Sequence, residues 1–405
     1  MRTTETIRPQ ASRLKSWPLP LLLLVLLGCD SSIFDAEDPG RITEEGLEDE
    51  SIIDPLVVGV EGTYFNAYDN VTFYTAVGSD ELVGGDTSEP INAASRRGEY
   101  LNFAGAGSRL VTSALWNPLQ EARFLAEDAS ERLEDLLADP GSDDRMARVR
   151  LYAGIAYLNL AEIFCRQAYD GGGEVSTEES YGMAVERFNE AEEIAERAGA
   201  DDVAEMARLQ RARAHLALGQ EQDALQDAGG VSEGFRWDAV YRSASGEENG
   251  LYNLQNVNNF AVVEEDYAEL EDPRVPVEIT DDMTPDNQIQ VRNQLKYPDR
   301  GSDMPMGTWQ EARLLEAEIL VGQGLYEDAM ALVNEVRNEA DVDPIPEDLT
   351  GADAMEAVQE ERKVELFLQG PLRMVDMRRW DAFPEDWETC VPIPYTEIQD
   401  NPNLD

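Results

Sequence analysis

The feature that most constrains the fold is a stretch of sequence that recurs further along the chain. Each copy reads as a helix, a glycine-containing turn and a second helix, because its apolar residues return at steps of three and four. The matching residues are Ala207-Arg208-Leu209, Ala212, Gly219 and Asp223-Ala224 in the first copy and Ala312-Arg313-Leu314, Ala317, Gly324 and Asp328-Ala329 in the second. Small side chains among them let paired helices approach closely, so the repeat predicts stacked helical hairpins.

Three further segments carry an apolar helical face and extend this scaffold. Residues 115–137 form one predicted helix, and residues 145–164 and 181–198 resemble a third hairpin with Gly154 and Ala184 at its small positions. Tetratricopeptide-like hairpins are therefore expected over about 145–228 and 307–340. Between them, about residues 230–305 show no clear period, and such a stretch is usually functional or disordered. We predict an all-α fold, with a scaffold of helical hairpins and a loop-rich ligand-binding insertion.

The N-terminus has the pattern of a secretory leader. Basic residues precede an apolar run, Leu19 to Leu27, which is shorter than the roughly 20 residues that cross a bilayer. The run ends in Leu26-Leu27-Gly28-Cys29, which looks like a lipobox. We expect residues 1–28 to be a lipoprotein signal peptide and Cys29 to carry the lipid anchor; an ordinary signal peptide beside a chance cysteine is the alternative. Residues 29–50 read as an acidic tether, and residues 51–405 as the folded domain.

The chain is strongly acidic, with 83 Asp and Glu against 32 Lys and Arg and a formal net charge of −51. No basic surface is available to neutralise phosphates, which excludes nucleic acid as a partner. Only Lys296 and Lys363 are lysines outside the leader. Because acid-rich and lysine-poor surfaces suit high ionic strength, we predict a halophilic or salt-tolerant protein. A hydrophobic content of 42% is enough for a large core, so the acidity does not indicate a disordered chain.

Two cysteines remain besides the anchor. An exported chain enters an oxidising compartment, so the even number favours a disulfide between Cys165 and Cys390. Two free buried thiols are the alternative, because sequence does not give their separation.

The C-terminal third carries a series of short motifs. They are Glu316-Ala317-Glu318, Gly324, Tyr326, Ala329, Val333-Asn334, Val336-Arg337, Glu361-Arg362-Lys363-Val364-Glu365-Leu366, Arg373, Asp376, Arg379-Trp380, Pro392-Ile393-Pro394, Glu397 and Asn401-Pro402. In this order they resemble the motifs of the SusD/RagB family, and the resemblance extends over about residues 50–405. Gln369-Gly370-Pro371-Leu372 replaces the family's usual Glu-Gly before Arg373, so this turn is expected to differ.

The resemblance implies a surface lipoprotein of the outer membrane that binds a nutrient, either an oligosaccharide or a peptide. It also implies a partner, a SusC-like TonB-dependent transporter, to which the nutrient is delivered. A helical-repeat scaffold that binds other proteins of the envelope is the alternative function. The C-terminal motifs favour the first interpretation, because generic helical repeats do not carry them.

Six charged residues of these motifs can be interpreted as a catalytic cluster or as a structural one. They are Glu361, Arg362, Glu365, Arg373, Asp376 and Arg379. Arginines interleaved with acids favour the ionised carboxylate, whereas a general acid needs a raised pKa. We therefore expect ion pairs that join helix to helix. His215, the single histidine, has no second histidine or nearby cysteine with which to form a metal site or a triad, so we predict no enzyme, no cofactor and no metal.

Ligand binding is expected in loops that carry aromatic rings, because such rings stack on sugar faces in glycan-binding relatives. The candidates are Trp237, Tyr241, Tyr252, Tyr267 and Tyr74. For each of them, packing of a loop onto the scaffold is an equally good interpretation.

Overall fold

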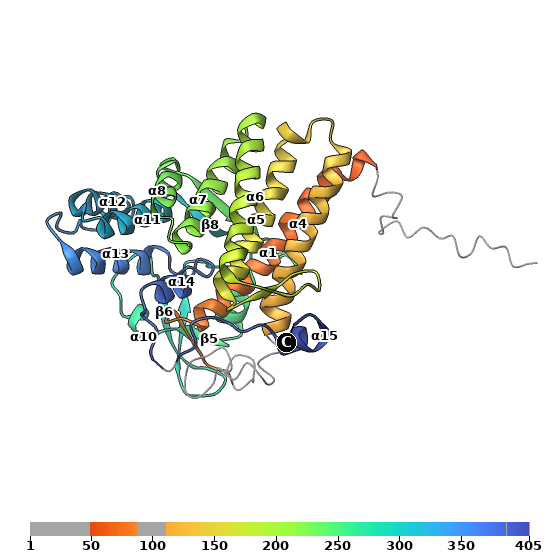
Figure 1. The fold of residues 1–405 in the computed structure, drawn as a ribbon. Coiled ribbons are helices and arrows are strands. Elements are labelled where there is room, and N and C mark those ends of the chain that lie inside the picture. Colours follow the sequence, from red (N-terminus) through yellow and green to blue (C-terminus); the bar gives the residue numbers. More distant parts are fainter. Residues whose placement is uncertain (1–48, 87–110, 386, 405) are drawn as a thin grey trace, which may run out of the picture. The chain divides into compact units, whose positions relative to one another are not determined.

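The computed structural model describes residues 49–86, 111–385 and 387–404 (Figure 1). The chain divides into a unit of residues 1–47 and a second unit of residues 48–405, and the description below concerns the second. The predicted signal peptide, Cys29 and nearly all of the predicted tether lie outside the described residues.

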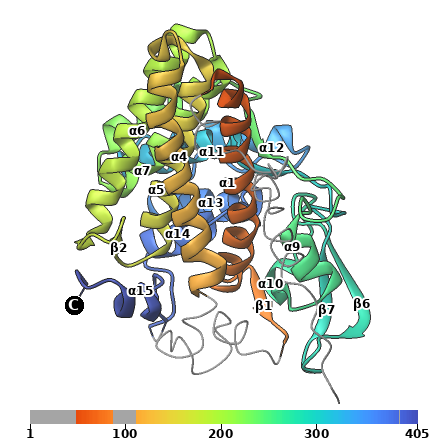
Figure 2. The same cartoon turned by 90° about the vertical axis from the view of Figure 1, so that its right-hand side faces the viewer.

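Four long helices lie side by side at one end of the hairpin scaffold (Figures 1 and 2). They are α1 (Ile53–Val77), α4 (Asn117–Leu136), α5 (Asp144–Ile163) and α6 (Thr177–Ala198). Helix α5 is buried along almost its whole length, and it begins where the side chain of Asp143 accepts a hydrogen bond from the backbone N–H of Arg145. Helix α6 begins at a capping box of Ser176 and Glu179, four residues before the predicted start at 181.

The predicted hairpins are present, and the all-α class with tetratricopeptide-like hairpins is confirmed. The repeat copies form α7 (Asp201–Ala217) with α8 (Glu221–Gly229), and α11 (Trp309–Gly322) with α12 (Tyr326–Glu339). The matched glycines of the two turns, Gly219 and Gly324, have φ angles of 70° and 78°. Glycine is the residue that adopts this left-handed conformation without strain, which explains its place in both copies. The C-terminal helices are α13 (Gly351–Glu365), α14 (Leu372–Arg379) and α15 (Tyr395–Asp400).

The third predicted hairpin consists of α5 and α6. A Cβ atom placed on Gly154 of α5 would lie 2.6 Å from a ring carbon of Phe188 on α6. Real Cβ atoms do not approach other atoms so closely, so the glycine is needed for the contact between these two helices.

The stretch predicted to be loop-rich contains short antiparallel strands. It begins with β4 (Arg236–Ala239) and ends with β8 (Met304–Thr308). These two strands pair with each other, so the two ends of the stretch lie side by side. Between them lie α9 (Gly250–Tyr252), η7 (Asn253–Val257), β5 (Ala261–Val263), α10 (Glu265–Ala268), β6 (Val277–Met283) and β7 (Gln290–Gln294). Strand β5 pairs with β1 (Leu82–Gly84), and β6 pairs with β7 (Figure 2). The remaining short elements are η4 (Glu50–Ile52), η5 (Val111–Trp116), η6 (Pro140–Ser142), β2 (Gln167–Ala168) and β3 (Glu174–Val175).

A disulfide joins Cys165, just after α5, to Cys390 in the C-terminal segment. The backbone follows the same link, because the N–H of Cys165 donates to the carbonyl of Val391 at 2.8 Å and Phe164 forms a parallel bridge with Val391. The C-terminal segment is therefore fastened to the end of α5.

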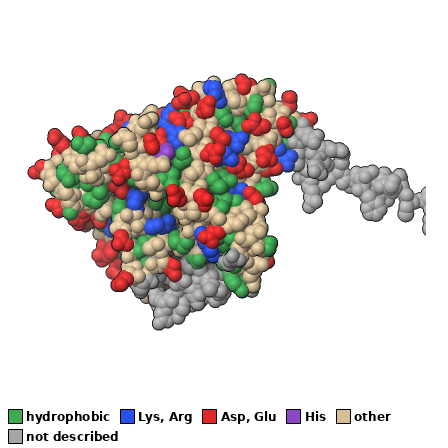
Figure 3. Space-filling model, in the orientation of Figure 1, with side chains coloured by type: hydrophobic (Ala, Val, Ile, Leu, Met, Phe, Trp, Pro, Cys, Tyr) green, Lys and Arg blue, Asp and Glu red, His purple; other side chains and the backbone are tan. Residues whose placement is uncertain are grey.

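Acidic side chains are spread over the face seen in Figure 3, with arginines interspersed among them. Among the described residues, no helix combines the length and the apolar character that spanning a bilayer requires.

Candidate functional site

A groove of about 680 Å³ lies beside β4 and contains two of the predicted ligand-binding residues, Trp237 and Tyr241. We call it the β4 groove. Helix α1 forms one wall, the N-terminal half of α5 and the first turn of α7 form the base, and β4 with the loop after it forms the other wall. Its lining residues are Val58, Glu61, Gly62, Phe65, Asn66, Arg148, Tyr152, Asp202, Arg236, Trp237, Asp238, Val240, Tyr241, Arg242, Gly246 and Glu247.

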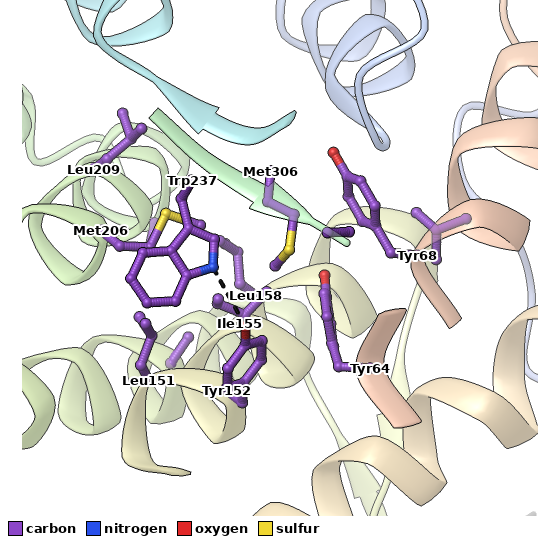
Figure 4. Packing of buried hydrophobic residues seen from close by; sticks show 14 of the residues in the cluster. Tyr64, Tyr68, Leu151, Tyr152, Ile155, Leu158, Met206, Leu209, Trp237 and Met306 are labelled. Atoms are coloured by element: carbon purple, nitrogen blue, oxygen red, sulfur yellow. Dashed lines mark hydrogen bonds between the residues drawn. The ribbon is translucent and has the colours of Figure 1, made fainter. Parts of the chain in front are cut away.

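The indole of Trp237 is held in place at the base of the groove. Its Nε1 donates to the hydroxyl of Tyr152 at 3.3 Å, and Figure 4 shows the ring among Leu151, Met206 and Tyr152. The guanidinium carbon of Arg148 lies 5.2 Å from the centre of the indole, a cation–π distance. Trp237 is 9% exposed, so a ligand in the groove meets part of the indole while the rest is anchored in the core.

The two tyrosines of the groove use their hydroxyl groups to fix the walls. Tyr241 donates to the backbone carbonyl of Phe65 on α1 at 2.8 Å, which ties the loop after β4 to that helix. The ring of Phe65 meets the ring of Tyr152 edge-on at 6.0 Å. Burial raises the pKa of both tyrosines well above the ordinary value, so both remain neutral at physiological pH.

Charged groups surround this aromatic base. Arg148 lies 3.3 Å from a carboxylate oxygen of Glu61 and 3.3 Å from one of Asp202. Burial raises the pKa of Glu61, and the opposite charge of Arg148 counteracts part of that rise. Val58 and Val240 add apolar surface, since they are 65% and 54% exposed. Ring faces, exposed methyl groups and polar groups on the rim together suit a ligand that is part apolar and part hydroxylated or amidic.

The other three predicted ligand-binding residues are not part of the groove. Tyr267 on α10 is 1% exposed and stacks on Phe367 at 5.1 Å, so in this structure its ring has a packing role. Tyr74 on α1 is half-buried and meets Phe73 edge-on at 5.0 Å. Tyr252 ends α9 and is also half-buried. Of the five predicted residues, the groove therefore contains Trp237 and Tyr241, and a ligand-binding role for all five stays a prediction.

Several groove residues were missed by sequence reasoning. Tyr152 and Arg148 belong to the helix predicted at 145–164, where they are indistinguishable from scaffold residues, and Phe65 is on α1. Nothing local marks these residues, because the groove exists only once β4 lies against α1 and α5.

The charged C-terminal motif forms ion pairs between helices. Arg362 on α13 donates from two nitrogens to Asp376 on α14, at 2.8 and 2.9 Å, and Asp376 also accepts from Arg379 at 2.9 Å. Arg379 and Trp380 both donate to Glu318 on α11. Although burial favours the neutral acid, the neighbouring arginines hold the pKa of Asp376 below its usual range. An ionised carboxylate in this setting cannot serve as a general acid. Asp376 instead joins α14 to α13, and Arg379 joins α14 to α11 through Glu318.

Two more acids of the motif, also on α13, form a second group of ion pairs. Glu361 pairs with Arg337 of α12 at 2.6 Å and with Arg274 of the insertion. Glu365 lies 3.2 Å from the same Arg274. The insertion is therefore connected to α13 by buried charge.

Arg373 completes the set and connects α14 to the segment after α1. Its guanidinium donates to both oxygens of Asp80, each at 2.6 Å. The turn that departs from the family pattern lies close by: Gly370 has a φ of 54°, its carbonyl accepts from Thr75 at 3.1 Å, and a Cβ atom there would lie 3.0 Å from the ring of Tyr68. A glycine at this turn is required by both its conformation and its neighbour.

His215 lies in the hairpin helix α7, where its Nδ1 forms a hydrogen bond with Gln220 and its Nε2 lies 3.6 Å from Asp227. Within the part of the chain that the structure describes, no three potential ligands are arranged as a metal site.

Comparison with known proteins points to one family. Residues 311–389 match the profile of the SusD family, and this segment contains the charged motif described above. No curated protein matches the sequence.

Solved structures described as SusD superfamily or SusD-like proteins share the fold over most of the chain. A SusD superfamily protein from Bacteroides vulgatus is 13% identical, with 89% of this chain and 98% of that chain covered and a TM-score of 0.65. A SusD-like protein from Bacteroides fragilis is 13% identical, with 90% and 98% covered and a TM-score of 0.69. A SusD-like carbohydrate binding protein from Bacteroides vulgatus is 14% identical, with 81% and 83% covered and a TM-score of 0.63.

The fold is therefore that of the SusD-like helical proteins. Residues 311–389, which carry the charged motif, resemble the corresponding segment of the SusD family.

Proposed function

We propose that this protein captures a nutrient, an oligosaccharide or a peptide, in the β4 groove and delivers it to a SusC-like TonB-dependent transporter. The observation that carries the proposal is the position of Trp237 and Tyr241 in one groove of a SusD-like fold. The groove offers the exposed part of Trp237 and the half-buried ring of Phe65, with charged and amide groups around them. Such groups are what a sugar ring or a peptide backbone with apolar side chains would contact. One similar structure is described as a carbohydrate binding protein, which favours the oligosaccharide.

Binding without catalysis fits the chemistry of the described residues. The acids of the charged motif are paired with arginines, and the tyrosines of the groove remain neutral because burial raises their pKa. Neither group offers an activated nucleophile beside a base.

The proposed location is the outer membrane, with a lipid on Cys29 as the anchor and the domain exposed at the cell surface. The lipobox-like sequence before Cys29 and the family of the domain support this location. Metabolic labelling with a palmitate analogue should mark the wild-type protein and leave Cys29→Ser unmarked, and labelling of both would refute the anchor.

The binding proposal is tested by a glycan and peptide array at high salt with three proteins. Val240→Arg places a long side chain in the groove at a position that is 54% exposed, so it should block the ligand with little effect on folding. Ile279→Arg is the matched control, because Ile279 is 53% exposed on β6 and does not line the groove. We expect wild type and Ile279→Arg to bind the same ligand and Val240→Arg to lose it. Equal binding by all three would place the ligand elsewhere.

The transporter is tested by affinity capture from the native outer membrane. Recovery of a TonB-dependent barrel supports delivery to a SusC-like partner. Recovery of other envelope proteins without a barrel would support the alternative, a helical-repeat scaffold that binds proteins.

A further inference from the structure

A second cavity, of about 270 Å³, lies between the helices that carry the charged motif. It is bordered by α5, α6, α7, α11, α13 and α14, whose positions can be followed in Figure 1. The cavity has no residue in common with the β4 groove. Four arginines line it, namely Arg213, Arg362, Arg378 and Arg379, together with two carboxylates, Glu162 and Asp376.

Three of the four arginines are neutralised. Arg213 pairs with Glu162 at 2.7 Å. Arg362 and Arg379 pair with the acids of the charged motif, as described above. Arg213 also lies 3.7 Å from Glu311, and burial raises the pKa of that acid to about 7. While Glu311 keeps its proton, the three guanidinium groups are balanced by Glu162, Asp376 and Glu318 and leave no net charge at the cavity wall.

Arg378 differs from the other three. Among the described residues, no carboxylate oxygen lies within ion-pair distance of it. Its Nε donates to the backbone carbonyl of Thr389 at 2.9 Å, and its Nη2 is buried without an acceptor. An uncompensated charge in this position is costly, because burial disfavours the charged form, and burial lowers the pKa of Arg378.

Tyr181 of α6 provides a second polar group on the same wall. It is 6% exposed, and no hydrogen bond of its hydroxyl is formed within the described part of the chain. Tyr181 and Arg378 are close enough for each to affect the pKa of the other. The rest of the lining is largely apolar and includes Leu216, Leu315 and Val375.

We propose that this cavity binds one small monocarboxylate, with its carboxylate on Arg378 and Tyr181 and its body along the apolar wall. A guanidinium presents parallel N–H groups that match the two oxygens of a carboxylate. The single uncompensated positive charge selects a monoanion, because a dianion such as phosphate would bring an unbalanced negative charge next to Glu162 and Asp376. The ligand can be a free short acid or an acidic sugar such as a uronate, since both present the same group.

Isothermal titration of the purified protein at constant salt distinguishes these ligands. The probes are glucuronate, glucose, acetate and inorganic phosphate. We expect 1:1 binding of glucuronate and no binding of glucose in this cavity, because the two sugars differ in the carboxylate. Acetate binding as tightly as glucuronate would identify a free short acid as the ligand. Phosphate binding more tightly than either would overturn the assignment to a monocarboxylate.

Three variants locate the site. Arg378→Gln should weaken glucuronate binding by at least about tenfold, and Tyr181→Phe by roughly threefold to tenfold, from the loss of a charged and a neutral hydrogen bond respectively. Arg197→Gln is the control, because Arg197 is 50% exposed on the same α6 and lies away from the cavity. Tyr181→Phe removes a single oxygen, so it remains informative if Arg378→Gln does not fold. Unchanged affinity in both variants, or no binding of any carboxylate to the wild type, would refute the proposal.

Discussion

Replacing Asp376 with Asn tests whether the charged motif holds the helices together. Asparagine has the same shape as aspartate, so the change removes a charge without leaving a cavity. Arg362 is 3% exposed, and the acid that would then remain within ion-pair distance of its guanidinium is Glu318, at 3.8 Å. Breaking one side of a buried ion pair costs about 3–5 kcal/mol, because the remaining charge is buried without compensation. For a domain of this size, with an unfolding entropy of roughly 0.7 kcal/mol/K, the melting temperature should fall by about 5 °C.

The assay is urea unfolding at constant salt, with Glu193→Gln as the matched control. Glu193 pairs with Arg197 on the surface of α6, where the two side chains are 70% and 50% exposed, so its loss should change stability by less than about 1 kcal/mol. Because the folded protein holds the pKa of Asp376 below that of the unfolded chain, the stabilisation by its charge is present above the unfolded pKa and is lost as the pH falls. The difference between wild type and Asp376→Asn should therefore shrink in acid. A loss no larger than that of the control at neutral pH would refute the structural role.

Three further predictions concern the stability of the whole domain. Replacing both Cys165 and Cys390 with Ala removes the disulfide, which closes a loop of 225 residues. Loop-closure entropy predicts that the free energy of unfolding, measured in urea, falls by up to about 5 kcal/mol. Reductant should not change the stability of this double variant. Burial raises the pKa of Glu81 from 4.5 to about 8 in the folded protein. Between these two pKa values the folded state retains a proton that the unfolded state has released, so the free energy of unfolding falls as the pH rises from about 4.5 to about 8. Glu81→Gln should therefore have a higher melting temperature than the wild type at pH 8 and a similar one at pH 4. A difference in melting temperature that is the same at both pH values would contradict the burial argument. The melting temperature should also rise from low to molar salt, because salt screens the repulsion between 83 acidic and only 32 basic residues, whereas a flat or falling curve would count against a halophilic surface.

The helical scaffold was predictable because its determinants are local. Gly219 and Gly324 end helices in the left-handed conformation, and the apolar residues around them repeat at helical spacing. Such signals depend on a few neighbouring residues and survive in a single sequence. The start of α6 was predicted four residues too late, because its capping box of Ser176 and Glu179 precedes the first apolar residues of the helix.

The ion pairs of the charged motif were predictable in kind but not in pairing. Spacing along α13 and α14 indicated that acids and arginines would meet, whereas the partners Arg274 and Asp80 lie far away in the sequence. Strands β4, β5 and β8 were missed because each is short and pairs with a segment distant in the sequence. The hairpin of β6 and β7 was missed because neither strand shows a sustained alternation of apolar and polar residues.

The β4 groove, which we propose as the binding site, was only partly predictable for the same reason. Trp237 and Tyr241 stood out as aromatic residues outside the repeats, and they share one wall of the groove. Tyr267 was an equally good candidate by this criterion, yet it packs against Phe367 in the core. Composition identifies aromatic residues in loops, whereas the tertiary contacts decide which of them faces a ligand.

Hydrogen–deuterium exchange with and without a ligand found on the array tests the central claim most directly, since it locates the ligand without altering the protein. The β4 groove predicts slower exchange in residues 58–66 of α1 and in residues 236–247 of β4 and the loop after it. Protection confined to other segments, with these two unchanged, would contradict the assignment of the groove as the nutrient-binding site.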